Sequence, residues 1–307
     1  MSLIVFGSLN MDLVAQTPRL PIGGETVQGQ YFLTASGGKG ANQAVAAARL
    51  GAVTHLVGRV GDDQFGAELL SGLKADQVNI EQILIQPQMA SGVAMITTNN
   101  QGENTIVIVA GANGTVDQTD VRRILPLLPE ATALLLQLEI PVSAVILAAK
   151  AAKEAGTTVI LDPAPAPDNL PDELYSLVDI ITPNETEAKR LTGVEINDQE
   201  SWEEAANILL TRGVKTAIIK LGARGVFCMS SSQQFHLPAF AVKAIDTVAA
   251  GDAFNGAMAT ALDRGLSLRQ ALTWGAAAGA LTTTKPGAQP ALPDWEIFDN
   301  FLHQSIE

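Results

Sequence analysis

The feature that most constrains the fold of this chain is a regular alternation of short apolar runs with longer helix-like runs. Strand-like runs bounded by Gly, Pro or Asp occupy residues 3–6, 54–60, 133–137, 158–161, 180–182 and 216–220. Helical patterns occupy residues 40–50, 64–76, 142–155, 185–191 and 202–212. Short strands that are each followed by a helix are typical of a parallel sheet covered on both faces. The sequence therefore predicts a doubly wound α/β sandwich with a mainly parallel sheet.

Two stretches of the chain interrupt this alternation. A strand-like run at 26–33 follows a Pro- and Gly-rich segment, and β-rich residues 91–98 and 104–109 flank a turn at 99–102. Because these strands have no helical crossovers of their own, we expect residues 12–36 and 91–111 to form a small separate β-sheet. Residues 1–11, 37–90 and 112–307 would form the main domain, and the small sheet would be a lid hinged near Asp12 and Gly37. The alternative is an antiparallel edge on the main sheet.

Composition narrows the class of partner. The 307 residues carry 19 Lys and Arg against 32 Asp and Glu, and the cations are scattered, which argues against a nucleic-acid partner. An anionic ligand must then be bound by local groups rather than by long-range attraction. Cys228 is the only cysteine, which excludes an intrachain disulfide and fits a reducing compartment. The first residues resemble a strand rather than a signal peptide, and no apolar run could span a membrane, so we expect a cytoplasmic location.

A run of small residues, Ala249, Ala250 and Gly251, leads directly into Asp252 and a helix-like segment. Backbone N–H groups at such a helix start can face an anion, and the helix dipole favours one there. A carboxylate repels an anion, so Asp252 is best explained as a general base that acts on a neighbouring hydroxyl. The simpler interpretation makes Asp252 the helix N-cap, and we expect the cap to hold the base in place.

The segment at 37–42, Gly-Gly-Lys-Gly-Ala-Asn, is neither a Walker A loop nor a dinucleotide fingerprint. Its glycines allow positive φ angles and a close approach of the backbone to a ligand. Lys39 supplies a charge, and Asn42 can both donate and accept hydrogen bonds, which would suit a small polyol. The alternative is a glycine turn that feeds a helix, with Lys39 in solvent.

Polar residues also follow two of the predicted strands, at the carboxyl ends where open α/β sheets bind ligands. Asn10 and Asp12 come after the first strand, and from an extended backbone their side chains would point the same way. Glu139 ends another strand in the same manner. The competing interpretations are an Asx turn at Asn10 and a solvated carboxylate at Glu139.

Three loops complete the candidate set. Asn184 and Glu187 fit a helix-capping arrangement, and they could also serve as a phosphate or water ligand and as an outer-sphere holder of Mg²⁺. Residues 220–225, Lys-Leu-Gly-Ala-Arg-Gly, follow a strand and form a weak nucleotide-contact motif. Residues 285–290, Lys-Pro-Gly-Ala-Gln-Pro, suit a loop whose carbonyls bind a cation or whose backbone flanks an adenine, although the pattern alone indicates a turn.

These motifs, in this order and spacing, resemble those of the PfkB carbohydrate kinases over essentially the whole chain. The resemblance implies ATP-dependent phosphorylation of D-ribose at O5, with Asp252 as the base and the N–H groups of Ala249, Ala250 and Gly251 as the anion hole. The sugar contacts it implies are Asn10, Asp12, Gly38, Lys39, Gly40, Ala41, Asn42, Glu139 and Asp252. The nucleotide contacts it implies are Asn184, Lys220, Leu221, Gly222, Ala223, Arg224, Gly225, Gly251, Asp252 and Ala276.

The family resemblance also implies two metal ions and a dimer. Glu187 would hold Mg²⁺ through water, and a potassium activator would lie among Asp246, Val248, Thr282, Lys285, Gly287 and Ala291. Family members commonly form homodimers through their lids. Relatives that phosphorylate ribose often carry Ser at position 291, and a polar residue at 276, so we expect one hydroxyl ligand fewer for potassium and a looser adenine contact. The alternatives are a kinase for another sugar or a nucleoside, and a non-catalytic sugar-binding regulatory protein.

Overall fold

The computed structural model describes residues 1–306. Its body is a nine-stranded sheet in the order β13-β12-β11-β10-β9-β8-β1-β4-β5. These strands are β1 (Ser2–Phe6), β4 (Thr54–Gly61), β5 (Ile83–Gln86), β8 (Ala131–Leu136), β9 (Thr158–Leu161), β10 (Ile180–Ile181), β11 (Thr216–Lys220), β12 (Val226–Ser230) and β13 (Gln234–Leu237). Neighbours from β5 to β11 pair in parallel, and β12 and β13 add an antiparallel edge. The predicted mainly parallel sheet is confirmed, while β5, β12 and β13 were not foreseen.

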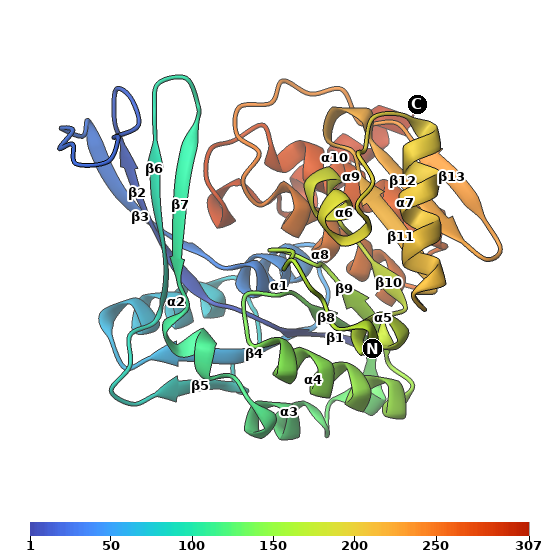
Figure 1. Ribbon diagram of the computed structural model, residues 1–307. Helices are drawn as coiled ribbons and strands as arrows, with labels where there is room; N and C mark the ends of the chain where they lie inside the picture. Colours follow the sequence, from blue (N-terminus) through green and yellow to red (C-terminus); the bar gives the residue numbers. More distant parts are fainter. Residues whose placement is uncertain (307) are drawn as a thin grey trace.

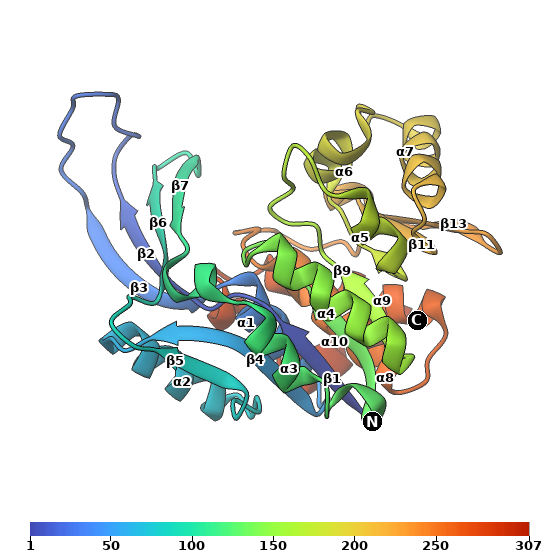
Figure 2. The ribbon, with the colours of Figure 1, turned by 60° about the horizontal axis from the view of Figure 1, so that its bottom comes forward.

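Helices cover both faces of this sheet (Figures 1 and 2). They are α1 (Lys39–Arg49), α2 (Gln64–Ala75), α3 (Gln118–Ile124), α4 (Val142–Ala155), α5 (Asp172–Leu177), α6 (Glu185–Thr192), α7 (Gln199–Thr211), α8 (Ala250–Asp263), α9 (Leu268–Thr282) and α10 (Trp295–Ile306). Ile4 and Phe6 of β1 pack with α3 to α7, whereas Leu3 and Val5 pack with α1, α2 and α8 to α10. Because successive strand residues point to opposite faces, one central strand builds both cores. None of the helices within residues 1–306 is long and apolar enough to cross a lipid bilayer.

A second sheet of four strands stands away from this body, at the upper left of Figure 1. Its order is β3-β2-β6-β7, formed by β2 (Asn10–Gln16), β3 (Tyr31–Gly37), β6 (Gly92–Thr98) and β7 (Asn104–Val109). A small separate sheet is therefore confirmed, and the alternative of an edge on the main sheet is wrong. The strand predicted at 26–33 is misplaced, because β3 begins at Tyr31 and pairs with β2 along its whole length. Motion of this sheet as a lid stays a prediction.

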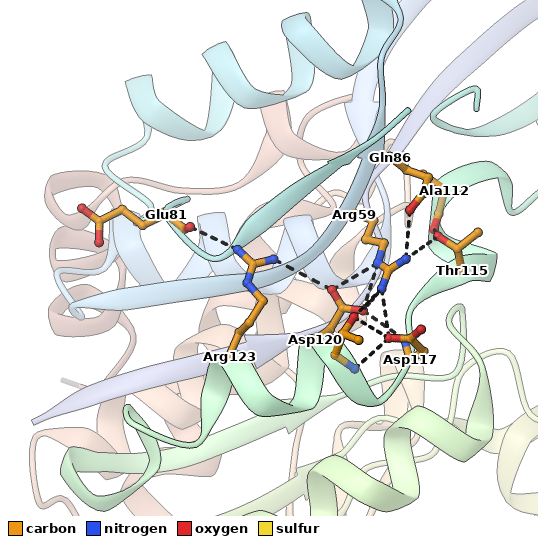
Figure 3. A network of polar contacts seen from close by, with 9 residues as sticks. Arg59, Glu81, Gln86, Ala112, Thr115, Asp117, Asp120 and Arg123 are labelled. Carbon is orange, nitrogen blue, oxygen red and sulfur yellow. Dashed lines mark hydrogen bonds and ion pairs between the residues drawn. The ribbon is translucent and has the colours of Figure 1, made fainter. Parts of the chain in front are cut away.

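A buried arginine of the main sheet binds the segment that follows the last strand of the small sheet (Figure 3). Arg59 of β4 donates to both carboxylate oxygens of Asp120 on α3, the shortest contact being 2.7 Å. It also donates to Gln86 Oε1 on β5 (2.9 Å) and to Thr115 Oγ1 (3.2 Å) in the 3-10 turn η1 (Gly111–Thr115). A buried charge is tolerated only when its donors are satisfied, as they are here. The network fixes η1, which follows β7, against the edge of the main sheet.

Candidate active site

One end of the candidate site is a cluster of polar groups around Glu139, just after β8. Glu139 Oε2 accepts hydrogen bonds from Ser8 Oγ (2.5 Å), from the backbone N–H of Lys39 (3.1 Å) and from Asn10 Nδ2 (3.4 Å). Asn10 is buried, and its Oδ1 accepts a hydrogen bond from Asn113 Nδ2 (2.8 Å) on η1. The structure therefore brings three of the predicted sugar contacts together, from β2, α1 and the end of β8.

Asp12 lies two residues from Asn10 on the same face of β2, as expected for an extended backbone, and the Asx-turn alternative is wrong. Its carboxylate packs against Gly37, where a Cβ would lie 2.4 Å from Asp12 Oδ2. Burial, followed by the charges of Glu139 and Asp252, raises the pKa of Asp12 to about 7. Near neutral pH such a carboxyl group can both donate and accept hydrogen bonds, which suits a sugar hydroxyl.

The glycines of the loop at 37–42 are required by the protein's own backbone. Gly38 has a φ of 90°, and a Cβ there would lie 2.6 Å from the backbone nitrogen of residue 10. A Cβ at Gly40 would lie 2.6 Å from the carbonyl carbon of Gly7. Ala41 donates its N–H to the carbonyl of Ser8 (2.9 Å). These contacts pack the start of α1 onto the end of β1, and this packing by itself requires the glycines at 38 and 40. The close approach of a ligand stays a prediction.

Asp252 lies in the first turn of α8, buried and directed toward α1. Its Oδ2 accepts a hydrogen bond from Asn42 Nδ2 (3.0 Å), and its Oδ1 accepts one from Gln43 Nε2 (3.2 Å). The predicted N-cap role is wrong, because the N-cap residue of α8 is Ala249. Ala249 has a φ of 58° and no side-chain cap, and α8 starts at Ala250. The side chains of α1, rather than a helix cap, hold Asp252.

Charges of both signs surround Asp252. Burial raises the pKa of Asp252 above its usual value, and Lys39 and the two amide donors act in the opposite direction. Burial by itself would lower the pKa of Lys39, but nearby carboxylates, led by those of Asp252 and Asp162, raise it instead. These charges favour the ammonium form of Lys39, which lies half-buried among the carboxylates rather than free in solvent.

The small residues before Asp252 form the start of α8. The N–H of Ala250 donates to the carbonyl of Thr247 (3.3 Å). The next N–H groups, those of Gly251 and Asp252, belong to the first turn of the helix and have no intrahelical partner. A Cβ at Gly251 would lie 3.2 Å from Lys220 Nζ, so an ammonium group faces this turn. The positive helix end and this ammonium make a local site for an anion, in a chain of strongly negative net charge.

A cavity of about 780 Å³ opens beside Asp252, within the range that small-molecule sites occupy. One part of its wall carries charged groups, and the other is built of small and apolar residues. The predicted residues in the wall are Lys39, Asn184, Glu187, Lys220, Gly222, Ala223, Gly225, Ala249, Ala250, Gly251, Asp252 and Ala276. Wall residues not predicted include Asp162, Val242, Ala244, Phe254, Gly279, Ala280 and Thr283.

The charged part of the wall is organised by one ion pair and one capping box. Lys220 Nζ lies 2.9 Å from Asp162 Oδ1. Asn184 Oδ1 accepts from the N–H of Glu187 (2.8 Å), and Glu187 Oε2 accepts from the N–H of Asn184 (2.8 Å), which confirms the predicted capping. Burial, followed by the charge of Asp162, raises the pKa of Glu187. Asp162 and Glu187 together carry more negative charge than Lys220 neutralises, which fits a bound cation at this part of the wall.

Two predicted nucleotide contacts do not face the cavity. Leu221 is 2% exposed and belongs to the core beneath the sheet. Arg224 forms an ion pair with Glu185 and lies over the ring of Trp202. Both lie in the connection between the antiparallel strands β11 and β12, where only the neighbouring small residues line the cavity. Their position follows from the antiparallel edge, which the sequence pattern did not reveal.

The loop predicted to bind a monovalent cation is held together by Asp246. Its Oδ1 accepts from the N–H of Val248 (3.0 Å), and its Oδ2 accepts from the N–H of Gly287 (2.8 Å). The N–H of Lys285 lies 3.4 Å from the carbonyl of Thr282. Asp246 thus joins the segment before α8 to the loop after α9. Ala291, in the 3-10 turn η4 (Gln289–Ala291), is buried and offers a methyl group in place of a hydroxyl.

Several polar residues of this region were missed from the sequence. Asp162 follows β9 as Glu139 follows β8, so the strand-end argument would have found it. Gln43 and Gln137 are buried in a hydrogen-bonded chain with Asp252, and Asn113 holds Asn10. Helical periodicity places Gln43 among apolar residues and does not indicate a role in the site. The sequence around η1 likewise contains no motif that points to Asn113.

Comparisons with known proteins agree with this arrangement. A family model described as pfkB family carbohydrate kinase matches residues 1–295. The chain is 44% identical over 304 residues to ribokinase of Haemophilus influenzae, covering 99% of each protein. It is 35% identical over 302 residues to deoxyribokinase of Salmonella typhi, covering 98% of this chain and 99% of that protein. Among solved structures, ribokinase of Arabidopsis thaliana complexed with ribose and ATP has a TM-score of 0.90 and 35% identity, over 98% of each chain.

Proposed function

Because the chain belongs to the pfkB family of carbohydrate kinases, we propose that it is an ATP-dependent kinase that phosphorylates D-ribose at O5. The products are D-ribose 5-phosphate and ADP. The observation that carries the proposal is the position of Asp252. Its carboxylate is held by Asn42, beside the polar cluster around Glu139, and it also lines the cavity of about 780 Å³. A base placed between a polyol-binding cluster and a nucleotide-sized cavity fits phosphoryl transfer to a hydroxyl.

In this proposal the polar cluster binds the sugar. Asn10, Asp12 and Glu139 make hydrogen bonds to the sugar hydroxyls, and Asn42 and Lys39 orient the acceptor hydroxyl toward Asp252. Three further residues of the 37–42 segment, at positions 38, 40 and 41, shape the pocket through their backbone. Asp12 supports this assignment because its pKa of about 7 lets the carboxyl group serve as donor or acceptor.

The chemical step uses one base and several fixed positive groups. Asp252 accepts the proton of the 5-hydroxyl as the oxygen attacks the γ-phosphorus in line. The bond between the γ-phosphorus and the bridging oxygen breaks, and ADP leaves. Backbone N–H groups at the start of α8, chiefly that of Gly251, and the ammonium of Lys39 stabilise charge on the transferred group. Burial around Asp252 excludes water that would otherwise accept the phosphoryl group.

The cavity holds the nucleotide in this proposal. Ala276 and its apolar neighbours surround the adenine, and Asn184, Lys220 and Gly225 approach the phosphates. Glu187 and the negative wall beside it fit a Mg²⁺ ion held through water, which would neutralise phosphate charge. Asp246 joins the two segments that would hold the potassium ion, which would bind through backbone carbonyls without a hydroxyl from Ala291.

The small sheet supports a homodimer as the assembly. Large apolar side chains lie exposed on its two edge strands, namely Tyr31, Phe32, Leu33, Ile106, Val107, Ile108 and Val109. Exposed apolar strands of this kind are usually covered by a partner. Light scattering should give a dimer, and Ile108→Lys should shift it to monomer; a monomeric parent protein would contradict the assembly. A cytoplasmic location stays a prediction.

A panel of sugars tests the proposed substrate. Ribose, 2-deoxyribose, other pentoses, hexoses and nucleosides are compared as acceptors with ATP, with and without potassium. We expect ribose to have the highest kcat/KM. A preference of about 100-fold or more for another acceptor would refute ribose, and 2-deoxyribose is the foremost rival because a deoxyribokinase is among the relatives.

A further inference from the structure

The amide of Gln43 occupies a position that the phosphoryl-transfer scheme above does not use. Its Nε2 lies 3.0 Å from Asp162 Oδ2 and 3.2 Å from Asp252 Oδ1, and it donates to both. An amide nitrogen carries two protons, so each carboxylate receives one. Gln43 is 1% exposed, and both carboxylates are buried. One side chain therefore links the base to the carboxylate in the cavity wall.

The two carboxylates set the orientation of this amide, and Gln137 binds its oxygen on the other side. Gln137 Nε2 donates to Gln43 Oε1 (2.7 Å), and Gln137 is fully buried at the end of β8. If Gln43 were flipped, its Oε1 would face two carboxylates and its NH₂ group would face another NH₂ group. Gly7 makes room for Gln137, because a Cβ at Gly7 would lie 2.1 Å from Gln137 Oε1. Only one arrangement of the two amides satisfies both carboxylates.

The charges around Asp252 show why this arrangement matters. Lys39 is the cation on the α1 side, and Asp12 from β2 and Asp162 after β9 are like charges. Lys220 pairs with the far oxygen of Asp162, and Glu187 adds negative charge across the cavity. Two buried carboxylates that lie within reach of one nitrogen repel each other unless donors lie between them. Asn42 binds only Oδ2 of Asp252, so Gln43 is the donor that lies between the two carboxylates.

We propose that Gln43 is a positioning residue for phosphoryl transfer, which fixes the plane of the Asp252 carboxylate and keeps Asp252 ionised, and that Gln137 fixes Gln43. The inference rests on the proposed function, since it assigns Asp252 the role of base. Each oxygen of Asp252 then receives one amide hydrogen bond, and a lone pair stays free for the proton of the sugar hydroxyl. Because Gln43 lies behind the carboxylate, its removal alters the base without removing a contact to either substrate.

The test compares Gln43→Met and Gln137→Met with the parent enzyme. For Gln43→Met we expect kcat to fall by about 10- to 100-fold with KM for ribose and ATP little changed. Loss of a donor to the ionised form raises the pKa of the base, so the acidic limb of the pH profile should move up by about one unit. Gln137→Met should act in the same direction but less. The double variant should be no worse than Gln43→Met, because the two side chains act in one chain.

Thr260→Val is the matched control, since Thr260 is buried on α8 and its hydroxyl bonds to the Gly256 carbonyl (2.9 Å) within the same helix. Its pH profile should match that of the parent. An unshifted acidic limb in Gln43→Met, or additive effects in the double variant, would overturn the proposal. If Gln43→Met does not fold, Gln137→Met carries the same test.

A parent protein without kinase activity would refute the proposed function instead. Infrared difference spectra that titrate the protonated carboxyl, with Asp252→Asn as reference, then still report whether Gln43→Met raises the pKa of Asp252. An upward shift supports the positioning role, and an unchanged titration refutes it independently of turnover.

Discussion

The two ends of the active site are built by opposite means. At the proposed sugar end, side chains from distant segments are tied to one another, as Glu139 is to Ser8, Asn10 and the backbone of Lys39. At the proposed nucleotide end, much of the wall is Gly, Ala and backbone, with an ion pair between Asp162 and Lys220. The first end depends on hydrogen-bonding side chains, whereas the second depends on small residues that leave space for a ligand. Substitutions should therefore fail by lost hydrogen bonds at one end and by added volume at the other.

The largest effect of this comparison is expected from Glu139→Ala. Removing the acceptor leaves three donors near the sugar without a partner, and each lost bond to a charged group is costly. We expect kcat/KM for ribose to fall by about 100-fold or more, with the affinity for ATP little changed. Glu154→Ala, on the exposed side of α4, is the control. Equal losses in ribose and ATP affinity would show that the two ends are not separable.

Added side-chain volume at the nucleotide end should have a smaller effect, and it should weaken the binding of ATP rather than of ribose. Ala276→Phe places a ring in the cavity wall of α9, so KM for ATP should rise about tenfold while KM for ribose at saturating ATP stays the same. Thr273→Phe, one turn earlier on α9 and outside the cavity wall, should leave both values unchanged. A higher KM for ribose in Ala276→Phe would contradict the view that added volume at this end affects ATP binding alone.

The smallest effect concerns stability without substrates. The pKa of Asp12 is about 7 in the folded protein, against the ordinary value of 3.8 expected for the unfolded chain. The folded state therefore binds this proton more tightly than the unfolded state does. The stability that this proton contributes is present below about pH 4 and is lost as the pH rises through 7. Asp12→Asn should therefore raise Tm at pH 8 by about 2–4 °C, and have little effect at pH 4. Asp168→Asn, which is 92% exposed, should show no pH-dependent gain.

The same contrast explains what the sequence could predict. The strand and helix alternation predicted six strands of the main sheet, since buried parallel strands read as apolar runs. These are β1, β4, β8, β9, β10 and β11. It missed β5 and β13, the two edge strands, whose partial exposure blurs the pattern. It also missed β12, which is buried but pairs antiparallel with β11 and has no helix between it and β13. At the site, Asp252 and Glu139 were recognisable because they follow small or apolar runs.

Other parts of the site depend on contacts between distant segments, which no local pattern encodes. Gln43 and Asn113 act on residues up to 209 positions away. The predicted cap at Asp252 was wrong for the same reason, because Asn42 and Gln43 of α1 hold that side chain instead.

The most direct test of the account is steady-state phosphorylation of ribose by Asp252→Asn, together with calorimetric binding of ATP. Asn keeps the size of the side chain and cannot accept the hydroxyl proton as a base. Asp263→Asn, at the other end of α8, is the control. The account predicts a kcat lower by about 10²- to 10⁴-fold with nearly unchanged ATP affinity. A variant that retains the parent kcat would contradict the assignment of Asp252 as the base.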